Sequence, residues 1–289
     1  MKIDKLSLLI YTCEQYLPIS KLSMEEFNRY TTDLEIKKYL VSNKITDDFF
    51  TDNLGFELLD SNVKFSENST HFADNLIYAL EKIEEKYVLL WVEDTIIGTD
   101  MKSQNLKSVI DLLDENEIDH LSLLSYGHDW EILDVNYSKY NLPDSLLFKM
   151  PNSYLYTFSL QPAIWNTKKL LEVLKHNQGI TLHQFDTSEI KNKKGILRSG
   201  DDGYGYINTP DDFWDYGIKH TCFRRTFETT PYCFDDRPFD GDYFLFLYSG
   251  IVRGGKFDFN THHNSREFVT KFLNERNITK EDDTYSKFF

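Results

Sequence analysis

The chain has 289 residues and a mass of 34.2 kDa, which at about 150 residues per domain fits one large domain or two small ones. Acidic side chains outnumber basic ones by 47 to 32, so the net charge is −15 and the pI lies near 5.0. The electrostatic field of so negative a protein repels phosphate backbones and anionic lipid, so we expect no nucleic-acid partner. A local basic site for one phosphorylated ligand is compatible with this net charge.

The cysteines and the N-terminal segment indicate the compartment. Cys13, Cys222 and Cys233 form no CxxC pair, which is typical of buried thiols in a reducing environment. The apolar run at residues 6–11 is short and no small-residue cleavage site follows it, so we expect neither a signal peptide nor an integral membrane segment. These features predict a cytoplasmic protein, and none of them indicates its oligomeric state.

Apolar patterning in the first half of the chain alternates between strand and helix. We expect strands at residues 6–12, 38–41, 87–92 and 120–124, and a short apolar piece at 56–59. Helices are expected from a capping box at Ser23 towards Tyr30, at residues 71–86, and around residues 106–113. This rhythm predicts an α/β protein with a mainly parallel, doubly wound sheet flanked by helices.

The second half of the chain is less regular. We expect strands at residues 154–160 and 243–248, and helices at 167–176 and 265–275. The intervening residues 178–242 are rich in Gly, Asp, Thr and aromatic side chains, a composition typical of substrate-binding loops. We therefore expect a single domain over residues 1–289.

Ligands of such sheets bind beyond the carboxyl ends of the strands. The polar residues directly after predicted strands are Thr12, Cys13, Ser42, Asn43, Glu93, Asp94 and Ser125. The adjacent carboxylates of Glu93 and Asp94 offer hard oxygen ligands that would hold a divalent cation against a diphosphate. An acidic turn, or a cap on the next helix, explains the same two residues, and their position alone does not decide between these interpretations.

Two other motifs indicate function less specifically than the Glu93-Asp94 pair does. Residues 250–257 nearly match the P-loop pattern, but Phe257 replaces the hydroxyl residue. Arg253 and Lys256 remain phosphate-binding candidates, and the alternative is a simple hairpin turn. The segment that contains His183, Asp186 and Glu189 offers a candidate general base, which spacing alone does not select.

Several segments, taken together, resemble GT-A-type glycosyltransferase-like proteins of bacterial polysaccharide (capsule and O-antigen) clusters and of phages. The likeness is densest at residues 79–94, which match the helix, the YVLLWV strand and the acidic motif of that family. Matching segments, in chain order, are Thr12-Cys13 with Tyr16, residues 159–165 (SLQPAIW), residues 183–186 (HQFD) and residues 254–256 (GGK). Glu93 stands where the family has an aspartate, and His183-Gln184 replace its usual Trp-Glu pair.

The resemblance implies a GT-A-like (Rossmann-like) fold and glycosyl transfer from a nucleotide-sugar donor to a glycan or another hydroxyl acceptor in polysaccharide biosynthesis. It also implies that residues 1–125 form the nucleotide-sugar-binding half of the domain and residues 126–289 the acceptor-binding half. Glu93 and Asp94 would hold Mn²⁺ or Mg²⁺ on the donor diphosphate, and Asp186 would accept the proton of the acceptor hydroxyl. The remaining implied roles are nucleotide binding by Thr12, Cys13, Ser42 and Asn43, sugar or acceptor binding by Gln161, Trp165 and His183, and phosphate binding by Arg253 and Lys256.

Two other classes of function remain open at this point. The same acidic pair would serve a metal-dependent phosphoesterase or nucleotidyl-transfer enzyme. A non-catalytic module that binds a sugar or a nucleotide would keep the fold without the chemistry. The sequence does not identify the sugar, the nucleotide or the acceptor, nor whether the anomeric configuration is inverted or retained.

Overall fold

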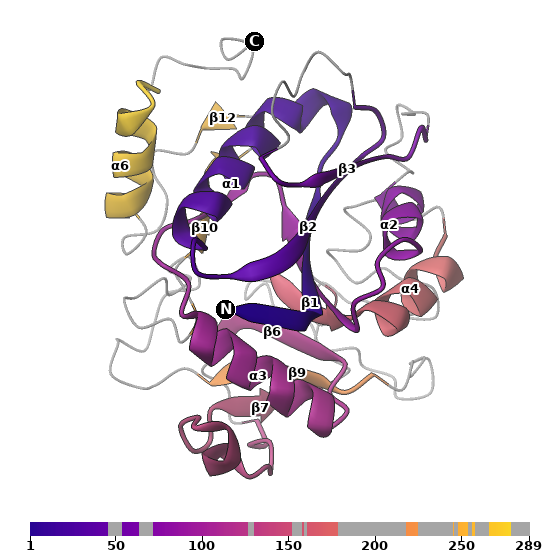
Figure 1. The fold of residues 1–289 in the computed structure, drawn as a ribbon, viewed down its shortest axis with the longest axis vertical. Coiled ribbons are helices and arrows are strands. Elements are labelled where there is room, and N and C mark those ends of the chain that lie inside the picture. Colours follow the sequence, from indigo (N-terminus) through magenta and orange to yellow (C-terminus); the bar gives the residue numbers. More distant parts are fainter. Residues whose placement is uncertain are drawn as a thin grey trace, which may run out of the picture.

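A mixed eight-stranded sheet with helices on both faces forms the centre of the protein (Figure 1). The computed structural model describes residues 1–45, 54–63, 72–126, 130–151, 158, 161–178, 218–224, 245, 248–253, 256–257 and 266–278. Within these residues the order of the strands in the central sheet is β3-β2-β1-β4-β8-β6-β9-β7. The predicted mixed α/β architecture with a mainly parallel sheet is confirmed.

The strands of this sheet are β1 (Lys2–Tyr11), β2 (Glu35–Ser42), β3 (Glu57–Asp60), β4 (Tyr87–Val92), β6 (His120–Tyr126), β7 (Leu147–Lys149), β8 (Ala163–Asn166) and β9 (His220–Arg224). The helices are η1 (Glu14–Tyr16), α1 (Leu17–Tyr30), α2 (Phe72–Leu80), α3 (Ser103–Glu115), η2 (Tyr137–Tyr140), α4 (Thr167–His176) and α6 (Arg266–Glu275). Two small antiparallel pairs join β5 (Thr95–Ile97) to β10 (Tyr248–Gly250), and β11 (Val252–Arg253) to β12 (Lys256–Phe257).

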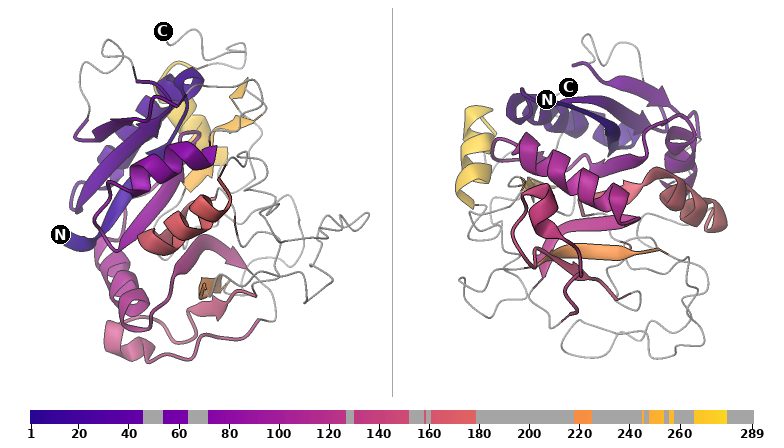
Figure 2. Two further views of the ribbon diagram at one scale, coloured as in Figure 1. Left: turned by 90° about the vertical axis from the view of Figure 1, so that its right-hand side faces the viewer. Right: turned by 60° about the horizontal axis from the view of Figure 1, so that its bottom comes forward.

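Strands β1 and β4 are apolar on both faces because helices cover both sides of the sheet. Leu8 and Leu89 pack on the face covered by α1 and α3, whereas Leu9 and Leu90 pack on the face covered by α2 and α4. Figures 1 and 2 show these helix pairs on opposite sides of the strands. The period-two alternation of side chains along each strand produces the two cores.

Strand β8 separates the two parallel parts of the sheet. It runs antiparallel to β4 on one side and to β6 on the other. Strands β1, β2, β3 and β4 pair in parallel with one another, and β6 pairs in parallel with β9. One uninterrupted group of four parallel strands, β3-β2-β1-β4, therefore presents its carboxyl ends along one edge.

Several boundary predictions need correction. Helix α1 begins at Leu17 with Pro18 in its first turn, so Ser23 lies inside the helix and caps nothing. Helix α2 ends at Leu80 rather than at residue 86, because the acids at positions 81, 84 and 85 would lie at the negative end of a longer helix dipole. Strand β9 lies within residues 178–242, where the sequence pattern predicted no element. Except for Phe158, the predicted strand at 154–160 lies outside the described residues.

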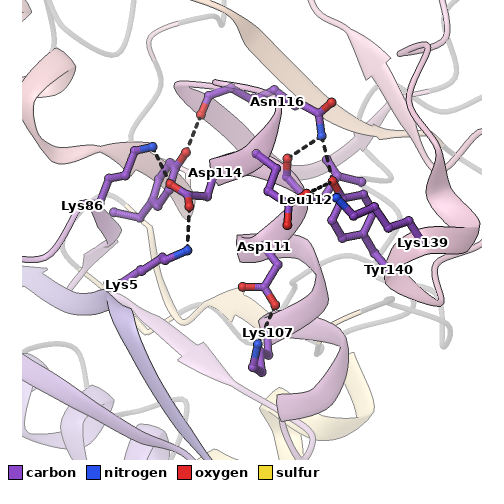
Figure 3. Close-up of polar contacts among 12 residues, drawn as sticks. Lys5, Lys86, Lys107, Asp111, Leu112, Asp114, Asn116, Lys139 and Tyr140 are labelled. Carbon is purple, nitrogen blue, oxygen red and sulfur yellow. Dashed lines mark hydrogen bonds and ion pairs between the residues drawn. The ribbon is translucent and has the colours of Figure 1, made fainter.

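Ion pairs connect the end of α3 to the amino-terminal edge of the sheet (Figure 3). Asp114 forms ion pairs with Lys5 of β1, at 2.6 Å, and with Lys86, directly before β4. Hydrogen bonds from these two lysines hold the pKa of Asp114 below its usual value. These contacts lie at the start of β1 and β4, which leaves the opposite edge of the sheet for a ligand.

Candidate functional site

The carboxyl ends of neighbouring parallel strands bring the predicted nucleotide-binding and metal-binding residues to one edge. Tyr11, the last residue of β1, pairs with Val41 of β2 and with Val92 of β4. The residues that follow these positions are Thr12 directly after β1, Ser42 at the end of β2 and Glu93 directly after β4. The register thus places the predicted residues side by side along the edge where ligands of parallel sheets bind.

Glu93 and Asp94 form the turn between β4 and β5, which we call the acidic turn. Both residues are partly buried. Burial, and secondly the charge of Asp94, raises the pKa of Glu93 to about 8. The Glu93 charge in turn contributes to raised pKa values of Tyr11 and Cys13. The acidic turn is therefore electrostatically coupled to the end of β1.

Three hydrogen bonds fix the backbone of Asp94, in the acidic turn, and of Thr95, directly after it. The carbonyl oxygen of Asp94 accepts a bond of 2.7 Å from the backbone N–H of Ile251. The carbonyl oxygen of Thr95 accepts one bond of 2.8 Å from Ser23 Oγ and another of 2.9 Å from Trp91 Nε1. Ser23 and Ile251, both distant in sequence, thus hold this part of the backbone together with Trp91 of the preceding strand.

Thr12 and Cys13 continue β1 beyond the sheet. Thr12 is buried, and its N–H donates to Val41 O at 2.9 Å. Burial, followed by the charge of Glu93, raises the pKa of the Cys13 thiol to about 11. A thiol with that pKa stays protonated at neutral pH, so Cys13 is not an activated nucleophile.

Ser42 ends β2 and Asn43 directly follows it, and both side chains are buried. Asn43 Oδ1 accepts a hydrogen bond of 2.8 Å from the N–H of Glu14, and Ser42 Oγ donates to Lys44 O at 3.1 Å. Asn43 therefore joins the end of β2 to the start of η1, which follows β1. These bonds fix the shape of the edge around the predicted nucleotide-binding residues.

Asp60, which ends β3 at the same edge, was not among the predicted site residues. Its register partner is Ser42, so it extends the row of polar strand ends by one strand. Asp60 accepts hydrogen bonds from the N–H groups of Ile45, at 3.2 Å, and Asn62, at 2.9 Å. Its position at the end of the third parallel strand was the signal that could have identified it.

Gln161 precedes β8, whereas Trp165 lies within it, and the two residues occupy different environments. Ala163, the first residue of β8, pairs with Leu90 near the carboxyl end of β4, so Gln161 comes before β8 on the side of the sheet where the acidic turn lies. Trp165 pairs with Val88, deeper in the sheet, and has no exposed surface. It packs against Phe158 and His120, with ring centroids 5.6 Å and 4.0 Å away. Gln161 therefore lies at the edge, whereas Trp165 belongs to the core.

The remaining predicted residues fall into two groups. Arg253 and Lys256 lie opposite each other in the antiparallel pair β11–β12, so this segment is not the strand-to-helix turn of a P-loop. This hairpin directly follows Ile251, which is hydrogen-bonded to the acidic turn, so its backbone lies near that turn. Asp186 and His183 lie outside the described residues.

The described residues offer few ligands for a metal ion. Among them, no three His, Cys, Asp or Glu side chains gather into a group that could hold a metal ion. The acidic turn therefore supplies two oxygen-bearing side chains, and a cation there would take its other ligands from elsewhere.

In the part of the chain that the structure describes, no helix is both long enough and apolar enough to span a bilayer.

No model of a known protein family matches the chain, and no curated protein sequence matches it either. Solved structures with a similar arrangement include S. aureus TarS in complex with UDP, at 17% identity and a TM-score of 0.38, covering 58% of this chain and 48% of that one. The mannosyltransferase PcManGT from Pyrobaculum calidifontis, in complex with GDP-Man and Mn²⁺, shares 14% identity at a TM-score of 0.38 and covers 75% and 56% of the two chains.

The bifunctional IspDF from Campylobacter jejuni matches with 18% identity and a TM-score of 0.34, covering 64% of this chain and 46% of that one. The chain thus spans about half the length of these three solved proteins. At such low identities and TM-scores we transfer no residue role from any of them.

Proposed function

We propose that this protein is a glycosyltransferase that moves a sugar from a nucleotide-sugar donor to a hydroxyl acceptor, as in polysaccharide biosynthesis. The observation that carries the proposal is the partly buried acidic turn at the carboxyl end of β4, beside the polar ends of β1 and β2. Two coupled carboxylates at this edge suit a diphosphate that brings a cation with it. The likeness of residues 79–94 to glycosyltransferase-like proteins supports the same conclusion.

The donor set of the acidic turn fits Mn²⁺ or Mg²⁺. Glu93 and Asp94 supply hard oxygen atoms, and the raised pKa of Glu93 reflects its burial and the repulsion between two neighbouring negative charges. A bound cation would neutralise charge on the departing diphosphate. Thr12, Cys13, Ser42 and Asn43 would surround the nucleotide, while Arg253 and Lys256 of the adjacent hairpin would approach its phosphates.

On the acceptor side we propose Gln161, His183 and Asp186. Asp186 would take the proton of the acceptor hydroxyl as that oxygen bonds to the anomeric carbon and the carbon–oxygen bond to the diphosphate breaks. A single direct displacement of this kind inverts the anomeric configuration. Because Trp165 is fully buried, we assign it a role in packing β8 within the sheet.

Thermal unfolding in the presence of nucleotides tests this function. Nucleoside diphosphates and nucleotide sugars, each with and without Mn²⁺, are added to the purified protein and the midpoint is recorded. Binding at a hundredfold excess over Kd stabilises the folded state by about 2.7 kcal/mol, which moves the midpoint by several degrees. We expect a shift with one nucleotide family that requires the metal. Shifts with none of them, in a folded protein, would contradict the proposal.

The pKa of Glu93 predicts how cation binding depends on pH. Its value of about 8 means that the metal-free protein holds this proton at neutral pH, and a cation must displace it. The affinity for Mg²⁺ with a nucleoside diphosphate should therefore rise as pH increases from 7 to 8 and level off above that range. Isothermal titration in buffers of different ionisation enthalpy measures the released proton.

Glu93→Gln is the matched variant for the pH experiment. It removes the titrating group, so we expect weaker binding, no proton release from this site and a flat pH profile. An unchanged slope in Glu93→Gln would show that another group titrates. The metal-free wild type should also lose stability between about pH 5 and pH 8, because a carboxyl whose pKa is raised on folding disfavours the folded state once it must ionise.

A further inference from the structure

The carbonyl oxygen of Thr95, directly after the acidic turn, receives hydrogen bonds from two buried side chains. Ser23 Oγ in α1 donates over 2.8 Å and Trp91 Nε1 in β4 donates over 2.9 Å. Ser23 is 2% exposed, Trp91 is 0% exposed and Thr95 is 5% exposed. Such bonds are strong in a dry environment and keep their geometry.

The bond made by Ser23 is unusual for a serine within a helix. Serine hydroxyls in helices ordinarily bond to a carbonyl of the preceding turn, as Ser20 does in the same helix by donating to Leu17 O at 2.5 Å. Ser23 instead reaches a residue 72 positions away in the chain. The side chain therefore joins two elements rather than stabilising its own helix.

Trp91 and Ser23 contribute differently to the turn. Trp91 belongs to β4, the strand that leads into the acidic turn, so its bond closes a local loop from Trp91 to Thr95. Ser23 belongs to α1, so its bond fixes the turn against the helix that covers the sheet. On the other side, β10 pairs with β5 and Ile251 N donates to Asp94 O at 2.7 Å. The turn is thus held from α1 and from β10.

We propose that Ser23 is a positioning residue for the acidic turn, acting through Thr95 to keep the Glu93 and Asp94 carboxylates directed at the donor diphosphate and its cation. The inference rests on the proposed function. Ligand-bearing groups held in place by hydrogen bonds from outside the ligand set bind metals more tightly. Fixing the turn in advance also spares the ligand the entropy cost of ordering it.

Ser23→Ala tests the role, with Ser20→Ala as the matched control. Both serines are buried in α1, but only Ser23 donates to Thr95 O, directly after the acidic turn. Trp91 still donates to Thr95 O in Ser23→Ala, so that carbonyl keeps a partner. We expect Ser23→Ala to weaken Mn²⁺-dependent nucleoside diphosphate binding about tenfold, and to speed hydrogen exchange in peptides covering residues 93–97. Ser20→Ala should change neither property, at a similar midpoint of thermal unfolding.

The two readouts separate the two proposals. If the wild type binds no nucleotide with metal, the proposed function fails, and hydrogen exchange alone then decides whether Ser23 restrains the turn. Equal exchange at residues 93–97 in both variants would overturn the inference. If the wild type binds the nucleotide, faster hydrogen exchange in Ser23→Ala together with an unchanged nucleotide affinity would also overturn the inference. If Ser23→Ala does not fold, Ser23→Cys fills the space with a weaker donor, and the same comparisons apply to it.

Discussion

Asp94→Asn is expected to weaken metal-dependent binding of the donor nucleotide by about a hundredfold or more and to reduce turnover at least as much. Losing a metal ligand that contributes about 3 kcal/mol to the binding free energy lowers the affinity by such a factor. The change is nearly isosteric, and the amide oxygen of Asn can still accept the 3.3 Å bond that Thr95 Oγ1 donates to Asp94 Oδ1. Calorimetric titration with Mn²⁺ and a nucleoside diphosphate measures the effect.

The electrostatic interaction of Asp94 with Glu93 predicts a second, independent effect of this variant, on thermal stability. Asp94 contributes to the raised pKa of Glu93, so its neutralisation should lower that pKa and remove repulsion from the metal-free protein. We therefore expect Asp94→Asn to unfold at the same temperature as the wild type or higher at pH 8. Asp100→Asn, at an exposed acid six residues downstream, is the control and should bind like the wild type. A variant that binds as tightly as the wild type would exclude Asp94 as a ligand.

Arg276→Ala should lower the free energy of unfolding by about 2–3 kcal/mol. Arg276 forms an ion pair with Glu26 of α1, whose side chain is only 3% exposed, and its guanidinium lies 4.1 Å from the ring centroid of Phe272. Removing one partner of a buried pair leaves a charge without full compensation. Arg29, at 3.6 Å from Glu26, compensates in part. Urea denaturation monitored by tryptophan fluorescence measures the loss.

Two comparisons make this prediction specific. Lys271 lies in α6 and forms an exposed pair with Glu275 at 3.8 Å, so Lys271→Ala should change the free energy of unfolding by less than about 0.5 kcal/mol. Adding Glu26→Gln to Arg276→Ala should recover part of the loss, because the buried charge is then removed as well. Equal stability of Arg276→Ala and Lys271→Ala would show that the pair does not hold α6 on α1.

Local sequence signals predicted those elements whose stability is local. Residues 87–92 form a strand apolar on both faces, and residues 167–176 form a helix whose cap, Asn166, accepts hydrogen bonds from the N–H groups of Lys168 and Lys169. Ser23 was misinterpreted because a serine followed three residues later by glutamate is typical of a helix start, yet Pro18 had already begun the helix. Strand β8 offers only four residues, too few for periodicity to reveal its direction or its neighbours.

The candidate site was predictable where position along a strand determines it. Residues that follow parallel strands share one edge, and this rule groups Thr12, Ser42 and Glu93 from their places in the chain alone. Contacts between distant segments were not predictable: Ser23 and Thr95 are 72 residues apart. The raised pKa of Glu93 was equally hidden, because it depends on how deeply packing buries the carboxyl.

The place of β8 in the sheet implies an order of assembly during synthesis. Strands β1 to β4 all lie within residues 2–92, so this group can pair as soon as that segment leaves the ribosome. Strand β6 is the next strand of the central sheet to be made, but it does not border β4, because β8 (residues 163–166) lies between them. Until β8 is made, β4 is an edge with unpaired backbone groups, the kind of edge on which nascent chains associate wrongly. Truncations that end between residues 126 and 162 should therefore aggregate, whereas the 289-residue chain covers that edge with β8.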